Sequence, residues 1–220
     1  MMTNSPASPI ETSPPAIDHL LFGVADLSEG IDLLENLLGT RPVIGGRHPA
    51  FGTHNALLSL GPGTYLEIIA ADPDRGRPER GVLFGLDRLV KPRLITWVLR
   101  AQHIDRLADR AAAADIGLGP VQSGSRRNPD GTRLSWRVTD PYAMPMGGAV
   151  PFLIDWGETP HPSGSAPRAG SLVSLRIEHP EAKLLRIRLR ALGIQIDVIE
   201  AESIRLTASL RTDRGSVELV

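Results

Sequence analysis

Apolar and polar residues are distributed along the chain in a pattern that repeats three times. Each copy begins with a short apolar run, continues with a segment whose apolar residues recur at helical spacing, and ends with further short apolar runs. Short apolar runs predict strands, and apolar residues three and four positions apart predict an amphipathic helix. The copies cover residues 17–67, 94–154 and 172–219. The pattern therefore predicts a small unit of strand, helix and several strands that has been duplicated.

The predicted helices carry start and stop signals. In the first helix, Asp26 and Glu29 have the spacing of a capping box, and Gly39 follows the last apolar position. Its apolar stripe consists of Leu27, Ile31, Leu34 and Leu38. The second helix is predicted to stop at Gly117 and the third at Gly193. Each helix has one apolar face, so each is expected to pack on a sheet.

Changes in composition set the predicted boundaries. Residues 1–16 are rich in Pro, Ser and Thr and predict a disordered lead, and residues 158–170 predict a linker. Residues 17–157 form one predicted domain of two units, and residues 171–220 form a degenerate third unit. One such unit cannot easily bury its sheet alone. The third unit should therefore pack on the main body or on a second copy of the chain, as in a homodimer.

Composition narrows the classes of partner. The net charge of −1, from 24 basic and 25 acidic residues, favours neither nucleic acid nor an acidic membrane surface. No apolar run approaches the length of a membrane span. The chain contains no cysteine, so it has no disulfide, thiolate ligand or cysteine nucleophile. This is compatible with a reducing cytoplasm, the expected location, and also with other compartments. The expected partner is a small molecule.

Two polar residues in the first unit are candidates for chemistry. His19 lies in its first predicted strand and Glu67 in its last, and both have apolar neighbours. A buried imidazole or carboxylate is costly unless it is paired or bound to a metal. The two residues are therefore candidate ligands of Fe, Mn, Ni or Zn and candidate catalytic residues. The alternative is a satisfied histidine at a strand start and a carboxylate at a rim.

Several motifs resemble those of the vicinal oxygen chelate superfamily, and most closely those of its glyoxalase-like domain proteins. In the first unit these are Ile17-Asp18-His19, Gly45-Gly46-Arg47-His48-Pro49, Gly52-Thr53-His54-Asn55-Ala56-Leu57, Leu60-Gly61 and Tyr65-Leu66-Glu67-Ile68. In the second they are Arg127-Asn128-Pro129-Asp130-Gly131, Leu134-Ser135-Trp136 and residues 150–156. The resemblance implies an α+β fold, in which repeated βαβββ units form a curled, mostly antiparallel sheet around the site.

The resemblance also implies up to four metal ligands on the first and last strands of the two units. His19 and Glu67 match two of these positions, whereas Thr96 and Phe152 match the other two and are poor ligands. Three explanations remain open. Waters complete the metal sphere, or His54 completes it from the adjacent strand, or the metal has been lost and the cavity binds an organic ligand.

The second unit offers a candidate anion site. Arg127 opens the turn at Asn128-Pro129-Asp130-Gly131, Trp136 lies further along the following strand, and Trp97 is another aromatic residue of the same unit. A guanidinium beside aromatic rings suits a carboxylate or phosphate. Arg126 is interpreted as a solvated neighbour, and His48 and His161 are given no chemistry. Predicted substrate-binding residues are Asn55, His54, Thr96, Trp97, Arg127, Trp136 and Phe152.

Two functions follow from these residues. The first is a metal-assisted lyase, isomerase or dioxygenase that acts on a small oxygen-rich metabolite, with His19 as ligand and Glu67 as ligand or base. The second is a metal-free protein that binds or sequesters a small organic acid or drug in the same cavity.

Overall fold

The computed structural model of the chain describes residues 16–74, 76, 78–127 and 131–220. Residues 1–15 of the predicted lead and the turn residues 128–130 lie outside this range. The first unit contains β1 (Ile17–Gly23), α1 (Leu27–Leu38), β2 (Val43–His48), β3 (Thr53–Ser59) and β4 (Tyr65–Ala71). As the capping signals predict, Asp26 accepts a hydrogen bond from the Glu29 backbone, and Gly39 ends α1 in the left-handed conformation.

The second unit has the same order of elements. It contains β5 (Arg93–Arg100), α2 (Ile104–Ala113), β6 (Gln122–Arg127), β7 (Arg133–Val138) and β8 (Phe152–Asp155). Helix α2 ends before the predicted stop at Gly117, because Asp115 already has the left-handed φ of 54°. Short 3-10 helices, η1 (Leu83–Arg88), η2 (Pro145–Gly148) and η3 (Pro162–Gly164), lie in the connections.

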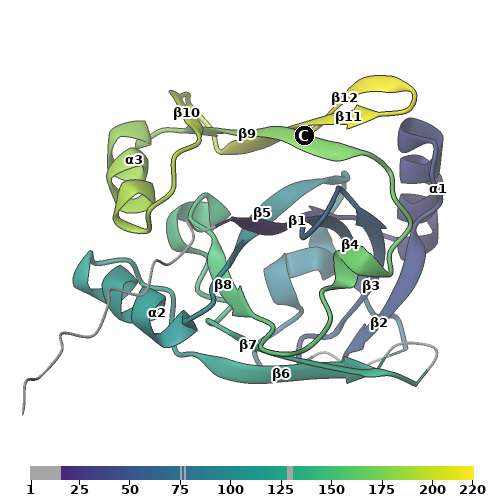
Figure 1. Cartoon of the computed structure of the whole chain (residues 1–220), viewed down its shortest axis with the longest axis horizontal. Helices are drawn as coiled ribbons and strands as arrows, with labels where there is room; N and C mark the ends of the chain where they lie inside the picture. The colour runs from purple at the N-terminus through teal and green to yellow at the C-terminus, as the bar shows by residue number, and fades with distance from the viewer. Residues whose placement is uncertain (1–15, 75, 77, 128–130) are drawn as a thin grey trace, which may run out of the picture.

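The two units form one eight-stranded sheet with the strand order β2-β3-β4-β1-β5-β8-β7-β6. The first and last strands of each unit pair in parallel, β1 with β4 and β5 with β8, and the other neighbours are antiparallel. The sheet curls so that β6 returns toward β2 (Figure 1). The predicted α+β fold with two βαβββ units around a curled sheet is confirmed.

Two glycines allow the ends of the curled sheet to meet. A Cβ on Gly46 would lie 3.0 Å from the carbonyl oxygen of Arg127 in β6. The neighbouring Gly45 accepts a hydrogen bond from the Arg126 guanidinium through its carbonyl oxygen. Glycine at these positions therefore lets the backbone of β2 come close to β6.

The third unit forms a separate four-stranded sheet. It contains β9 (Ser171–His179), α3 (Ala182–Ala191), β10 (Asp197–Glu200), β11 (Arg205–Thr212) and β12 (Gly215–Leu219). The element order is the predicted one, but β9 lies between β10 and β11, whereas β1 pairs with the last strand of its own unit. The strand order within the third unit therefore differs from that within the first two units.

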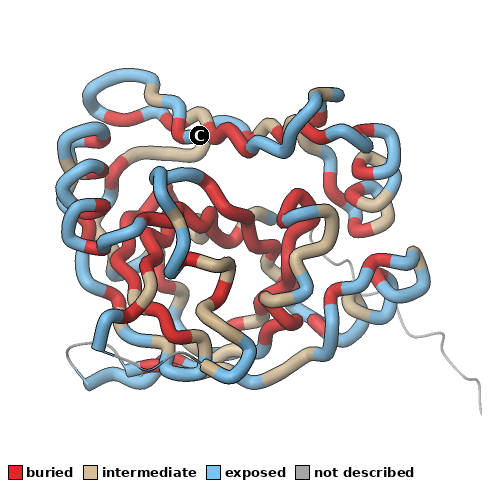
Figure 2. The backbone as a smooth tube through the Cα atoms, turned by 180° about the vertical axis from the view of Figure 1, so that it is seen from behind, coloured by how far each residue is buried: buried red, intermediate tan, exposed pale blue. Residues whose placement is uncertain are grey.

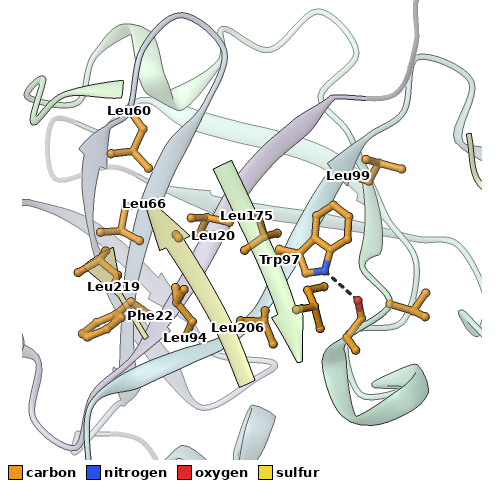
Figure 3. Packing of buried hydrophobic residues seen from close by; sticks show 14 of the residues in the cluster. Leu20, Phe22, Leu60, Leu66, Leu94, Trp97, Leu99, Leu175, Leu206 and Leu219 are labelled. Atoms are coloured by element: carbon orange, nitrogen blue, oxygen red, sulfur yellow. Dashed lines mark hydrogen bonds between the residues drawn. The ribbon is translucent and has the colours of Figure 1, made fainter. Parts of the chain in front are cut away.

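The second sheet covers the outer face of the first. Leu20 and Leu66 of the first sheet share a buried cluster with Leu175, Leu206 and Leu219 of the second (Figure 3). This cluster is large, and the backbone positions that run through the middle of the molecule are predominantly buried (Figure 2). The apolar face of the third unit is thus buried within its own chain.

Residues 158–170 join the two sheets and are bonded to the first. Ser59 at the end of β3 donates to the Pro167 carbonyl and accepts from the Ala169 backbone. His161 bonds to the buried Asp18. Across the described residues, the structure has no helix of the length and apolarity required to span a membrane.

Candidate functional site

A small cavity lies inside the curled sheet. Its volume is about 60 Å³, below the 300–1,000 Å³ typical of pockets for drug-sized ligands. Its polar lining comes from His19, His48, Asn55, Glu67 and Arg126, and its apolar lining includes Phe84, Trp136, Phe152 and Trp156. The cavity thus combines a few ionisable groups with mostly apolar walls.

The central pair consists of His19 on β1 and Glu67 on β4. In the parallel pairing of these strands, His19 lies opposite Tyr65 and Leu21 opposite Glu67, so the two side chains are diagonal neighbours on one face. The His19 Nε2 atom is 3.3 Å from Glu67 Oε2, and both residues are buried. The Tyr65 ring stacks on the imidazole with 4.4 Å between ring centroids. The pair is therefore held in a fixed, largely dry position.

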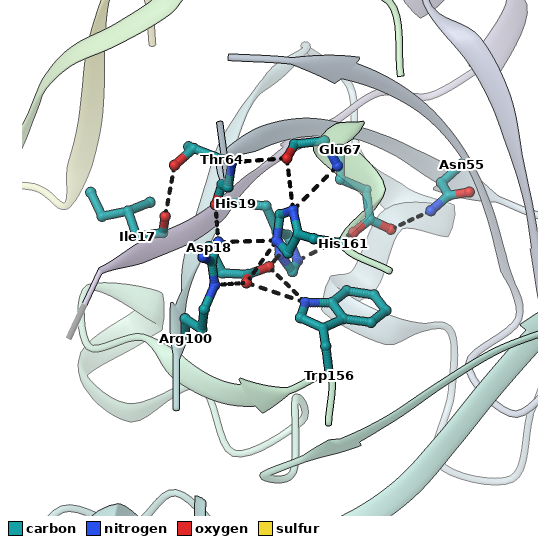
Figure 4. Close-up of polar contacts among 11 residues, drawn as sticks. Ile17, Asp18, His19, Asn55, Thr64, Glu67, Arg100, Trp156 and His161 are labelled. Atoms are coloured by element: carbon teal, nitrogen blue, oxygen red, sulfur yellow. Dashed lines mark hydrogen bonds and ion pairs between the residues drawn. The ribbon is translucent and has the colours of Figure 1, made fainter. Parts of the chain in front are cut away.

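Asp18 lies behind His19 and is completely buried. Its Oδ1 is 2.8 Å from His19 Nδ1, and its Oδ2 accepts from Arg100 Nε at 2.9 Å and is 3.0 Å from His161 Nε2 (Figure 4). Trp156 Nε1 adds a donor at 3.2 Å. Burial alone would raise the pKa of Asp18, but hydrogen bonds from His161 and His19 hold it well below its ordinary value. Both oxygens of the buried Asp18 carboxylate therefore take part in hydrogen bonds.

A backbone irregularity explains how neighbouring residues meet in this cluster. Successive residues of a regular strand point to opposite faces. The register of β1 against β5 shifts between Ile17 and His19, so Asp18 falls at a bulge. Bulges re-aim side chains and are frequent next to active sites. The bulge thus allows Asp18 and His19 to hydrogen-bond although they are adjacent in sequence.

Two further polar residues surround Glu67. The Asn55 amide on β3 donates to Glu67 Oε1 at 2.7 Å. Arg126 on β6 is buried and lines the same cavity. Burial lowers the pKa of Arg126, and the negative charge of Glu67 opposes this shift. The cavity therefore contains a guanidinium and a carboxylate that are both shielded from water.

An aromatic wall closes the cavity on the side of the second unit. Trp136 and Trp156 have ring centroids 5.5 Å apart, and His48 meets the edge of Trp136. Phe152 presents its edge to His19, with 6.4 Å between centroids. Burial lowers the pKa of His48, which favours its neutral form. These rings favour a ligand with an apolar body.

The structure brings His19, Asn55, Glu67, Trp136 and Phe152 together in the cavity, as expected. Four other predicted residues lie elsewhere.

Arg127 is exposed, and it lines a surface hollow beside β2 and β6 together with His54. The hollow adjoins the cavity at Asn55 and Arg126, but Arg127 and His54 do not line the cavity itself. Side chains alternate along a strand, so Arg126 and Asn55 face the cavity in their place. Trp97 is fully buried in the core between the sheets and donates to the Ala149 carbonyl.

Thr96 is buried, and its hydroxyl donates to the Gly148 carbonyl at 2.9 Å, outside the cavity lining. Residues that contribute to the site and were not predicted from the sequence include Asp18, Arg126, Tyr65, Trp156 and His161. Asp18 had a sequence signal, because an aspartate in the middle of an apolar run must be paired when it is buried. No sequence signal pointed to His161, because it lies in a segment whose composition is typical of a linker.

The described residues do not fit a resident divalent metal. Across residues 16–74, 76, 78–127 and 131–220, no group of three or more His, Asp and Glu side chains is arranged to hold a metal ion. His19 and Glu67 contact each other, His54 faces away, and the Thr96 hydroxyl is already bonded. The Arg126 guanidinium also shares the cavity, and its charge opposes a cation there. His19 and Glu67 thus meet as expected, but no third protein ligand joins them among the described residues.

The curled pair of βαβββ units is the fold of the vicinal oxygen chelate superfamily. The chain matches the model of the glyoxalase-like domain over residues 17–193, and it belongs to this family. The match extends beyond the predicted domain boundary at residue 157 and includes β9 and α3. Among curated proteins, none matches the sequence.

One solved structure has a similar fold over most of both chains, and two others are more distant. A hypothetical protein from Staphylococcus aureus is 12% identical with a TM-score of 0.67, over 93% of this chain and 98% of that one. A methylmalonyl-CoA epimerase from Mycobacterium tuberculosis is 20% identical with a TM-score of 0.43, over 64% and 87%. The Streptomyces coelicolor epimerase with 2-nitronate-propionyl-CoA is 18% identical with a TM-score of 0.42, over 65% and 98%. At these identities the likeness concerns the fold alone.

Proposed function

We propose that the protein binds a small carboxylic acid that carries a neighbouring carbonyl group and catalyses proton transfer on it, as an isomerase or lyase does. The observation that carries this proposal is the joint burial of Arg126, Glu67 and His19 around one small cavity. A buried guanidinium suits a carboxylate, and the cavity volume of about 60 Å³ suits a compound of a few heavy atoms. No step in this proposal passes through a metal.

The His19–Glu67 pair supplies the acid and the base. Glu67 takes a proton from the carbon next to the carbonyl, so a C–H bond breaks and an O–H bond forms. His19 Nε2 gives a proton to the carbonyl oxygen, and the electron pair of the broken bond forms the C=C bond of an enol. Asn55 fixes one oxygen of Glu67 and leaves the other beside His19. A positioned acid and base contribute roughly 10² to 10⁴ in rate.

Binding without turnover is the second candidate, and the small, largely apolar cavity supports it equally. The cavity residues come from one chain, so the proposal requires no homodimer. A cytoplasmic location also stays a proposal, which cell fractionation would test.

The binding test compares two adjacent arginines. Acetate, propionate, pyruvate and glyoxylate are titrated into the protein, and affinity is measured by calorimetry or by ligand-observed NMR. Arg126→Gln should weaken binding about 30-fold, because loss of one charge-assisted partner costs about 2 kcal/mol. Arg127→Gln is the matched control, since Arg127 points away from the cavity. Equal effects of the two variants would contradict the assignment.

The turnover test follows the methyl protons of pyruvate in D₂O by NMR. The wild type should exchange them for deuterium, and Glu67→Gln should exchange them at least about 100-fold more slowly. Carboxylate binding without exchange in the wild type would leave binding or sequestration as the function. Absence of binding by all four compounds would overturn the proposal.

A further inference from the structure

The two oxygens of Asp18 have different surroundings. Oδ2 accepts from Arg100 Nε at 2.9 Å and from Trp156 Nε1 at 3.2 Å, and His161 Nε2 lies 3.0 Å from it. Oδ1 faces His19 Nδ1 at 2.8 Å and has a longer contact of 3.3 Å with Trp156. The donor cluster on Oδ2 therefore fixes the carboxylate in one orientation, with Oδ1 directed at His19 (Figure 4).

The hydrogen-bond network also assigns the position of a proton on His19. The Ser163 backbone N–H donates to His161 Nδ1 at 3.2 Å, and His161 Nε2 lies 3.0 Å from Asp18 Oδ2 and 3.1 Å from Arg100 Nη2. Asp18 is a carboxylate and can only accept. His19 must therefore carry a proton on Nδ1. Its Nε2 then faces Glu67 Oε2 at 3.3 Å, and the proposed reaction requires a proton between these two atoms.

We propose that Asp18 is a positioning residue that, fixed by Arg100, Trp156 and His161, keeps a proton on His19 Nδ1 and thereby makes Nε2 the atom that gives a proton to the ligand. This inference rests on the proposed function and deepens it. It also makes residues 158–170 part of the site, because they supply His161 and hold it through Ser163.

The variant Asp18→Asn has a definite structural outcome. The amide oxygen must take the place of Oδ2, because Arg100 Nε and Trp156 Nε1 donate to it, and the amide NH₂ group then takes the place of Oδ1. It donates to His19 Nδ1, which must lose its proton, and the remaining proton moves to Nε2. His19 can then no longer release that proton without becoming an anion. Fixing the wrong tautomer in this way is costly in other acid–base dyads of Asp and His.

Nitrogen-15 NMR of the imidazole rings tests the inference without any ligand. The chain has six histidines, so His19 can be assigned from the spectrum of His19→Gln. The wild type should show a protonated Nδ1 on His19, and Asp18→Asn should show an unprotonated Nδ1. An unprotonated Nδ1 in the wild type would overturn the inference even if Asp18→Asn failed to fold. An unchanged ring in a folded Asp18→Asn would also overturn it.

Exchange of the pyruvate methyl protons in D₂O gives the second readout. Asp18→Asn should lower the exchange rate at least about 100-fold and leave pyruvate affinity within about twofold, because Arg126 is unchanged. A parallel loss of affinity and exchange would show a structural role and would contradict the inference. If the wild type binds and exchanges no pyruvate, the proposed function fails, whereas the ring measurement still decides the role of Asp18.

Discussion

Substitution of Gly45 by alanine tests how the first unit makes room for its site. An ideal Cβ on Gly45 would lie 2.4 Å from Asn55 Oδ1, about 1 Å short of the 3.4 Å at which ordinary contacts begin. Among the described residues, no group donates to Asn55 Oδ1, and the opposite end of this amide bonds to Glu67. The added methyl group therefore pushes the amide away from Glu67.

The expected cost is about 2 kcal/mol, because a hydrogen bond to a charged group is worth about 1.5–3 kcal/mol and overpacking costs about 1–3 kcal/mol. Urea denaturation measures it as a lower midpoint with an unchanged slope. Gly117→Ala is the matched control, because a Cβ there has no neighbouring atom within 4 Å.

A double-mutant cycle identifies the cause of the loss. In an Asn55→Ala background the Gly45→Ala substitution should cost less than about 0.5 kcal/mol, since the clashing amide is gone. Equal midpoints for Gly45→Ala and Gly117→Ala would refute the reasoning. A full cost of Gly45→Ala in the Asn55→Ala background would show that a contact other than the amide is responsible.

Three other outcomes are expected. Trp97→Phe should lower stability by about 2 kcal/mol in urea and leave carboxylate affinity unchanged, because this side chain belongs to the core; weakened binding with unchanged stability would contradict this. The folded pKa of Asp18 lies below its ordinary 3.8, so its stabilisation is present above pH 4 and is lost as the pH falls further; Asp18→Asn should flatten that acid limb of the stability curve. Protein purified without chelator should hold much less than one equivalent of Fe, Mn, Ni or Zn by elemental analysis, and added Zn²⁺ or Mn²⁺ should not raise the melting temperature; stoichiometric metal that is lost in His19→Ala would refute the metal-free site.

The sequence predicts the helices and strands of this fold well, but it predicts poorly which side chains of a strand face the cavity and which face the second sheet. Helices α1 and α2 are half exposed, so their apolar stripes are visible. The central strands are buried on both faces, and such strands show nearly continuous apolar runs rather than alternation. In β1, Leu20 and Phe22 face the second sheet, whereas His19 and Leu21 face the cavity. The apolar run alone does not show which set lies where.

This loss of alternation explains the errors at the site. Trp97 and Val98 are consecutive in β5, and both are fully buried, but Trp97 joins the core between the sheets. A shift of one residue moves a side chain to the other face of a sheet. In the same way, the sequence does not show whether Arg126 or Arg127 faces the cavity, nor whether His54 or Asn55 does. His19 and Glu67 were identified because a family motif specifies their positions directly.

The predicted boundary at residue 157 separates parts that depend on each other physically. Residues 158–170 pair with the end of β3 and bring His161 to Asp18, so part of the support of His19 comes from outside the first two units. The second sheet then covers the apolar face formed by residues such as Leu20 and Leu66. That face would otherwise be a large exposed apolar patch, which soluble proteins rarely tolerate. The third unit is therefore part of what keeps the sheet buried and the site in position, which agrees with a family match that continues to residue 193.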